Sequence, residues 1–187
     1  MTTSTMHPST TSSTWTLDPA HTLVEFAAKH LMITTVKGRF TGVSGTIHMN
    51  ETDPTASSVE AVIDAASIDT RTDQRDAHLK SADFLEVERY PEITFRSTTV
   101  ERAGDAHYRV TGDLTIHGVT KRVVLDVHDE GRTKDPWGGE RAGFSATTRI
   151  DRRDFGLTWN QVVESGGVLV GNEIRITLEV EATKSAS

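Results

Sequence analysis

The segment from Tyr108 to Val127 alternates apolar and polar residues in two consecutive runs, with His117 and Gly118 between them. Because successive side chains of a β-strand point to opposite faces, a period of two predicts two strands that each bury one face. A turn at the glycine joins them into a hairpin. Such half-buried hairpins are typical of β-barrels and sandwiches. The apolar positions are Tyr108, Val110, Leu114, Ile116, Val123, Leu125 and Val127.

The same alternation recurs along most of the chain, so we expect an all-β fold of about eight long antiparallel strands. The exception is residues 70–88, where charged residues surround apolar ones without a period of two. One or two short helices fit this insertion best, and Phe84 and Leu85 are expected to plug an opening in the sheet. A sheet of this size with one apolar face can close into a barrel.

Composition limits the other possibilities. The length of 187 residues suits one domain, and the absence of cysteine excludes disulfides, thiolate metal sites and a cysteine nucleophile. A net charge of −7 argues against nucleic-acid binding, which needs clustered Lys and Arg. Residues 1–14 are expected to be a disordered Ser/Thr-rich tail that resembles no secretory signal, and no stretch is apolar enough for a membrane span. We therefore expect a cytoplasmic protein, with a second short tail at residues 183–187.

The expected interior mixes large and small side chains, and this leaves two interpretations open. Small inward residues such as Ala61 and Ala146 either leave space for one small ligand or only accommodate close packing in a filled barrel. A filled barrel would serve as a structural or partner-binding module. The absence of any co-purifying ligand would distinguish it from a ligand-binding barrel.

Polar candidates for chemistry are few. The eight histidines show no metal-ligand spacing, so we expect no metal site, no cofactor and no catalytic residue. His30 continues an inward face, where a buried imidazole needs either a structural partner or the polar end of a ligand. Arg75 and His78 in the helical insertion could meet a headgroup, or Arg75 could fix the loop by pairing with an Asp. An enzyme that uses His30, Arg75, Asp76 or His78 as acid or base stays as an alternative.

Several ordered motifs resemble the YceI-like family of lipid-binding barrel proteins. They include G-x-L-T-I-x-G-V-T-K from Gly112, R-D-x-H-L from Arg75, and I-x-R ending at Arg152, and the resemblance runs from Trp15 to Ala182. It implies a lipocalin-like barrel whose apolar tunnel binds, stores or transports an elongated lipophilic molecule, such as a polyisoprenoid or isoprenoid quinone. The alternatives are an enzyme acting on a lipid or quinone-like substrate at the tunnel mouth, and the filled barrel.

The resemblance and the alternation together give a set of expected ligand-binding residues. Three polar residues, His30, Arg75 and His78, are candidates for a headgroup. The lipid itself, the pathway it serves and a homodimer as the oligomeric state are left open. The apolar candidates for the tunnel wall are Val24, Phe26, Phe40, Ile63, Phe84, Phe95, Leu114, Ile116, Phe144 and Ile176.

Overall fold

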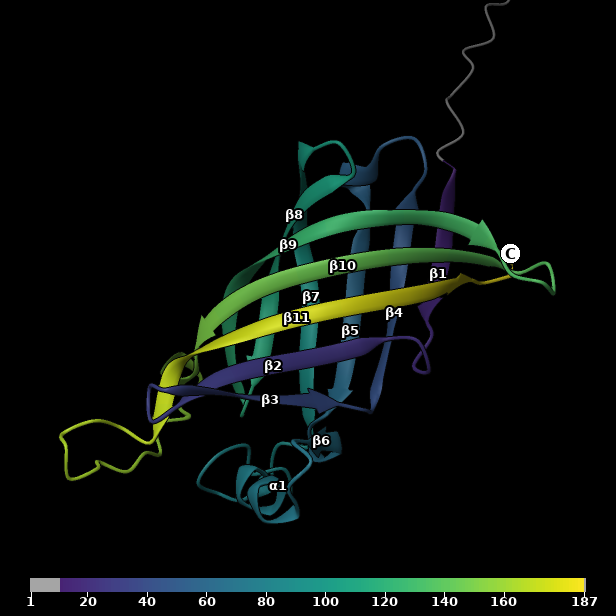
Figure 1. Ribbon diagram of the computed structural model, residues 1–187. Helices are drawn as coiled ribbons and strands as arrows, with labels where there is room; N and C mark the ends of the chain where they lie inside the picture. Colours follow the sequence, from purple (N-terminus) through teal and green to yellow (C-terminus); the bar gives the residue numbers. More distant parts are fainter. Residues whose placement is uncertain (1–10, 187) are drawn as a thin grey trace, which may run out of the picture.

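The computed structural model describes residues 11–186, which form one antiparallel sheet of eleven strands with short helical segments (Figure 1). The strands are β1 (Ser12–Leu17), β2 (Leu23–His30), β3 (Thr34–Phe40), β4 (Val43–Asn50), β5 (Ser58–Asp64), β6 (Ile68–Asp69), β7 (Glu92–Gly104), β8 (His107–Ile116), β9 (Val119–Lys134), β10 (Glu140–Asp151) and β11 (Val170–Lys184). The helical segments are α1 (Asp73–Lys80) and the 3-10 helices η1 (Pro54–Ala56), η2 (Ala65–Ser67) and η3 (Arg152–Phe155).

The sheet closes into a barrel because β1 pairs with β4 on one side and with β11 on the other. Eight strands complete the ring in the order β1, β4, β5, β7, β8, β9, β10 and β11. The β2–β3 hairpin continues the wall along the first half of β11, where β2 takes over the pairing from β1. The expected all-β fold, an eight-stranded antiparallel barrel with a short helical insertion, is confirmed.

The β8–β9 hairpin forms as its sequence predicts. Ile116 pairs with Val119, and the two residues between them, His117 and Gly118, both have positive φ angles of 53° and 71°. A two-residue turn with this backbone has the twist that antiparallel strands need. Val110 and Leu114 on β8 are 7% and 8% exposed, so the alternating face is the buried face of the barrel wall.

The helical insertion lies across one end of the barrel (Figure 1). Its start is fixed to β6 by Thr70, which donates from its backbone N and its hydroxyl to Asp76 and accepts from Arg75. The turns after α1 bury Phe84 and Leu85, as expected for residues that plug an opening. In the described part of the chain no helix is long and apolar enough to cross a membrane.

Both ends of the barrel domain extend beyond the boundaries expected from the sequence. β1 begins at Ser12, inside the expected tail, because Ser12 pairs with Asn50 and the following residues continue this ladder. At the other end Lys184 still pairs with Trp15, whose side chain is fully buried. The rest of the expected N-terminal tail, residues 1–10, lies outside the described residues.

Candidate functional site: an apolar cavity inside the barrel

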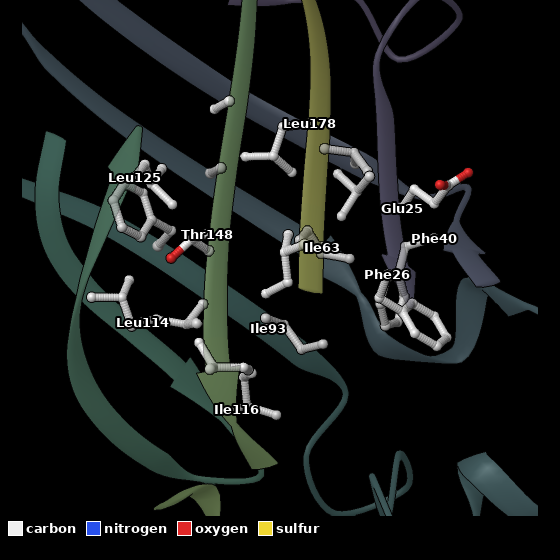
Figure 2. Close-up of a pocket in the computed structure, with 18 of the residues that line it drawn as sticks. Glu25, Phe26, Phe40, Ile63, Ile93, Leu114, Ile116, Leu125, Thr148 and Leu178 are labelled. Carbon is white, nitrogen blue, oxygen red and sulfur yellow. The ribbon is translucent and has the colours of Figure 1, made fainter. Parts of the chain in front are cut away.

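The barrel encloses a cavity of about 340 Å³. Small-molecule sites measure roughly 300–1,000 Å³, so this cavity lies at the lower end of their range. Figure 2 shows side chains from strands on opposite sides of the barrel converging on it, among them Leu114 of β8, Ile63 of β5 and Leu178 of β11. The atoms that the wall presents to the cavity are apolar. The interior is therefore an apolar cavity large enough for a small ligand.

The structure places all ten apolar candidates on the wall of this cavity. For the nine that lie in strands, the inward direction follows from the period of two, which sets the face of every residue once one residue of a strand is placed. Phe84 lies in the turns after α1. Ala61 and Ala146, the small residues that left two interpretations open, also line the cavity. The ten candidates on the wall are Val24, Phe26, Phe40, Ile63, Phe84, Phe95, Leu114, Ile116, Phe144 and Ile176.

Several polar side chains of the wall have partners within the protein. Thr148 donates its hydroxyl to the Val124 carbonyl at 2.8 Å, so that group is satisfied by the neighbouring strand. Glu25 turns its carboxylate away from the apolar side chains (Figure 2) and pairs with Lys37 at 3.0 Å. A ligand in the cavity would therefore be held by apolar contact and shape at these positions.

Arg152 is the one charged side chain of the described wall that is buried, at 3% exposure. Its guanidinium donates to the carbonyls of Gly171, Leu157, Trp159 and Val170 at 3.0, 2.6, 2.9 and 3.4 Å. A fifth bond reaches the Asn172 side chain at 3.3 Å. Burial lowers the pKa of Arg152 below its ordinary value. Because its donors bind carbonyls at both ends of the segment 157–171, Arg152 fixes this segment to the barrel.

The three headgroup candidates lie elsewhere. Arg75 donates to the Thr70 carbonyl and hydroxyl at 2.8 and 2.7 Å, so it fixes the loop through hydrogen bonds and not through the expected pairing with an Asp. His78 donates a hydrogen bond from Nε2 to the carboxylate of Asp83 at 2.8 Å. His30 ends β2, opposite Thr34. None of the three is among the wall residues in the described chain, but His78 packs against the wall residue Phe84 with their rings 5.1 Å apart, and His30 pairs with the wall residue Val170. Their headgroup role stays a prediction.

Sequence reasoning missed several wall residues. Leu79 comes from α1, whereas Leu157 and Val170 come from the segment that Arg152 holds. These residues lie in or beside irregular structure, where no period tells which way a side chain points. The signal for Arg152 was present in the I-x-R motif, but an arginine in an otherwise apolar pattern reads as a surface residue.

Two groups of side chains have the residue types of a metal site. His107 and His128 stack across β8 and β9 with their rings 4.3 Å apart, and Asp126 accepts from His107. Their ligand atoms lie within 4.8 Å of one another. The second group is Asp18 and His21 with Glu181. Hydrogen bonds and ion pairs within the protein account for both groups, and neither belongs to the cavity wall of the described chain.

The fold and the cavity together define the class: a small antiparallel barrel with an apolar interior. Residues 15–182 match the family model of the YceI-like domain, and the chain belongs to that family. A UPF0312 protein of Vibrio parahaemolyticus is 43% identical over 138 residues, which are 74% of this chain and 73% of that protein. A UPF0312 protein of Shewanella baltica is 41% identical over 138 residues, or 74% and 72% of the two chains.

Solved structures show the same fold. The YCEI protein of Campylobacter jejuni is 33% identical with a TM-score of 0.73, and the match covers 84% of this chain and 90% of that one. BcnA of Burkholderia cenocepacia has a TM-score of 0.79 at 24% identity, covering 89% and 99%. A polyisoprenoid-binding domain from Saccharophagus degradans, implicated in plant cell wall breakdown, has a TM-score of 0.66 at 17% identity, covering 91% and 98%. Because the identities of the last two matches are this low, they show a shared fold and nothing about function.

Proposed function

We propose that the chain binds one elongated lipophilic molecule inside the barrel and thereby stores or carries it through water. The observation that supports this most is the apolar cavity of about 340 Å³, whose polar neighbours Thr148, Glu25 and Arg152 already have partners within the protein. A pocket of this kind selects by shape and apolar area. The cavity favours the open interior over the filled barrel.

Apolar burial is sufficient to hold such a ligand. Each Å² of apolar surface removed from water contributes about 25 cal/mol, so roughly 300 Å² contributes about 7 kcal/mol before the costs of association. The small volume favours a single hydrocarbon chain over a bulky ring system. An isoprenoid chain meets this requirement, and the structural neighbour from Saccharophagus degradans is described as polyisoprenoid-binding. Polyisoprenoids and isoprenoid quinones are therefore the ligand classes that we propose.

An enzymatic role has less support. Of the candidate acids and bases, Asp76 accepts two hydrogen bonds from Thr70, and Arg75 donates to the same residue. These groups stabilise the start of α1 and do not reach the cavity wall. We therefore propose binding without conversion of the ligand. The cytoplasmic location expected from the sequence stays a prediction.

The test is mass spectrometry of an organic extract of the protein, purified without detergent. We expect one class of lipophilic molecule at close to one equivalent per chain, recovered chemically unchanged after incubation. Extracts without such a molecule, combined with failure of the purified protein to take up a farnesyl or longer isoprenoid probe, would contradict the proposal. Uptake followed by a chemically altered product would instead support the enzymatic alternative.

A further inference from the structure

Large apolar side chains gather on the surface at one corner of the barrel. Six such residues are exposed in the described chain, and four of them lie on two segments that are joined by hydrogen bonds. Leu31, Met32 and Ile33 form the turn between β2 and β3 and are 37%, 60% and 78% exposed. The fourth, Val162, is 78% exposed and belongs to the segment between η3 and β11. We refer to these four residues as the apolar tip.

Hydrogen bonds connect the two parts of the apolar tip. Leu31 donates its backbone N–H to the Leu169 carbonyl at 2.9 Å, and Leu169 in turn donates to Gln161 at 2.9 Å. Val162 forms a β-bridge with Val168, so residues 161–169 make a small hairpin beside the β2–β3 turn. In Figure 1 this hairpin projects from the barrel at the same side as that turn. The four side chains therefore belong to one protruding surface.

The turn holds its apolar residues in an unfavourable backbone. Leu31 and Met32 both have positive φ angles, 52° and 58°, in a turn closed by Ile33 N–H to the His30 carbonyl at 3.0 Å. Asn and Gly usually occupy such positions, because residues with a branched or long side chain are strained there. Strained backbone of this kind concentrates at functional sites. Here the strain keeps two large apolar side chains turned toward solvent.

The apolar tip lies close to the wall of the cavity. Ala28 lies three residues before Leu31 and lines the cavity, as does Val170, which pairs with His30 and follows Leu169 directly. β3 pairs with β6 only at Arg39 and Phe40, so the first half of its outer edge has no strand partner among the described residues. The wall of the cavity therefore comes close to the apolar tip along β2, at Ala28, and at the start of β11, at Val170.

From these observations we infer that the apolar tip inserts into the surface of a lipid bilayer, and that the ligand passes between bilayer and cavity at this end of the barrel. The inference rests on the proposed function, since it names the phase from which the ligand comes. A second copy of the chain fits the apolar tip less well as a partner than a bilayer does. Stable protein interfaces bury roughly 800 Å² on each partner, more than four side chains on a protruding turn and hairpin provide, whereas shallow insertion needs only a small apolar surface.

The chemistry of the tip also indicates which bilayer it binds. The net charge of −7 opposes attraction to anionic lipids, so apolar burial has to drive the contact. Insertion of so few side chains gives weak, reversible binding, as a single lipid anchor does. We therefore expect binding to neutral phosphatidylcholine that changes little when the salt concentration is raised about tenfold.

The experiment is flotation of the purified full-length chain with phosphatidylcholine vesicles. Ile33→Glu and Met32→Glu place a carboxylate where the side chain inserts, and we expect each to reduce the bound fraction at least about 10-fold. Trp137→Glu is the matched control. Trp137 is 86% exposed and lies in the turn before β10, at the opposite end of β11 from the β2–β3 turn. This variant should bind as the parent chain does.

Two outcomes of the flotation experiment overturn the inference, and sedimentation supplies a third. One is a parent chain that does not float with the vesicles, and the other is a Trp137→Glu variant that loses as much binding as Ile33→Glu. Sedimentation of the same proteins shows whether Ile33→Glu separates a dimer, which would assign the tip to a second copy. Ala146→Phe distinguishes this inference from the proposed function, because it fills the cavity and leaves the tip intact. It should lose ligand and still bind vesicles.

Discussion

The ring of Phe26 on β2 lies so close over Gly38 of β3 that a Cβ atom at residue 38 would stand 2.4 Å from its Cζ atom. Gly38 is the cross-strand partner of Phe26. A similar close approach occurs between Phe95 of β7 and Gly112 of β8, where the corresponding distance is also 2.4 Å, although Gly112 pairs with Ser97 in the register of the two strands. In both pairs the ring occupies the space that a side chain would take on the neighbouring strand. The glycines thus keep large rings close to the wall and leave the centre of the barrel open.

Replacing Gly38 by alanine should therefore disturb both stability and binding. The new methyl group displaces the Phe26 ring, and overpacking of this kind costs about 1–3 kcal/mol in the free energy of unfolding. Denaturant titration measures the loss, and ligand occupancy should fall in the folded fraction. Gly143→Ala is the control, since its Cβ would meet Glu130 at an ordinary 3.4 Å. If the two variants are equally stable, the glycine does not set the position of the ring.

Arg152 should be needed for folding rather than for binding. Arg152→Met keeps the aliphatic length but leaves the carbonyls of Leu157 and Gly171 without their donor. Each unsatisfied buried acceptor costs about 1–3 kcal/mol, so we expect a loss of at least about 3 kcal/mol in the free energy of unfolding. Arg153→Met, next in the chain but 57% exposed and paired with Asp151, should change stability little. Thermal unfolding of both variants checks this, and equal melting temperatures would contradict it.

A second arginine network predicts a pH dependence of stability. The hydrogen bond from His21, together with those from Arg141 and the Ala20 backbone, lowers the pKa of Asp18 from 3.8 to about 2. The stabilisation is therefore present above pH about 4 and is lost as the pH falls toward 2. The hydrogen bond to Asp18 raises the pKa of His21 above 6.5, so the His21 contribution is fully present below pH 6.5 and is lost at higher pH.

Asp18→Asn should therefore destabilise the protein most near pH 5. Solvent screening reduces the effect of this partly exposed group, and we expect about 1 kcal/mol in the free energy of unfolding. Urea unfolding at a series of pH values measures the difference, which should vanish as the pH approaches 2. Glu60→Gln, which removes an exposed pair with Arg96, is the control. A difference that is constant with pH would show that the carboxylate of Asp18 has no part in it.

The expectation that the protein holds no metal stays a prediction, and His107 and His128 give it a direct test. We expect that elemental analysis after exhaustive dialysis finds no stoichiometric zinc, iron or copper, because His107 and Asp126 already bind each other. Stoichiometric metal that is lost in His107→Ala would overturn the prediction. His48→Ala, a surface histidine near Thr14, is the matched control.

The strands and the apolar wall could be predicted because one rule connects them to the sequence. Once Leu114 is placed inside, the period of two places Ile116 inside as well, and pairing repeats this from strand to strand. The helical insertion could be recognised by the absence of this period. The positions of its side chains could not, since Arg75 of α1 reaches its partner Thr70 through the path of the loop between β6 and α1.

Contacts between distant segments could not be predicted from the sequence. His107 and His128 are 21 positions apart, and only the register of β8 with β9 stacks their rings. Trp159 packs against His78 of α1 with their rings 4.6 Å apart, which ties the segment after η3 to the helical insertion. Nothing in the local pattern of either residue predicts this contact. Such pairings depend on strand register and on the path of the loops, and the alternation of apolar and polar residues does not determine either.

We propose that the apolar volume of the cavity, and not a polar contact, retains the ligand. The most direct test is ligand occupancy after expression, measured by mass spectrometry on folded variants. Ala61→Phe and Ala146→Phe place a ring in the cavity and should lose most of the ligand. Arg75→Ala and His78→Ala leave the cavity open and should keep it, since a neutral hydrogen bond contributes only about 0.5–1.5 kcal/mol. Full occupancy in the Phe variants with complete loss in the polar variants would contradict the account.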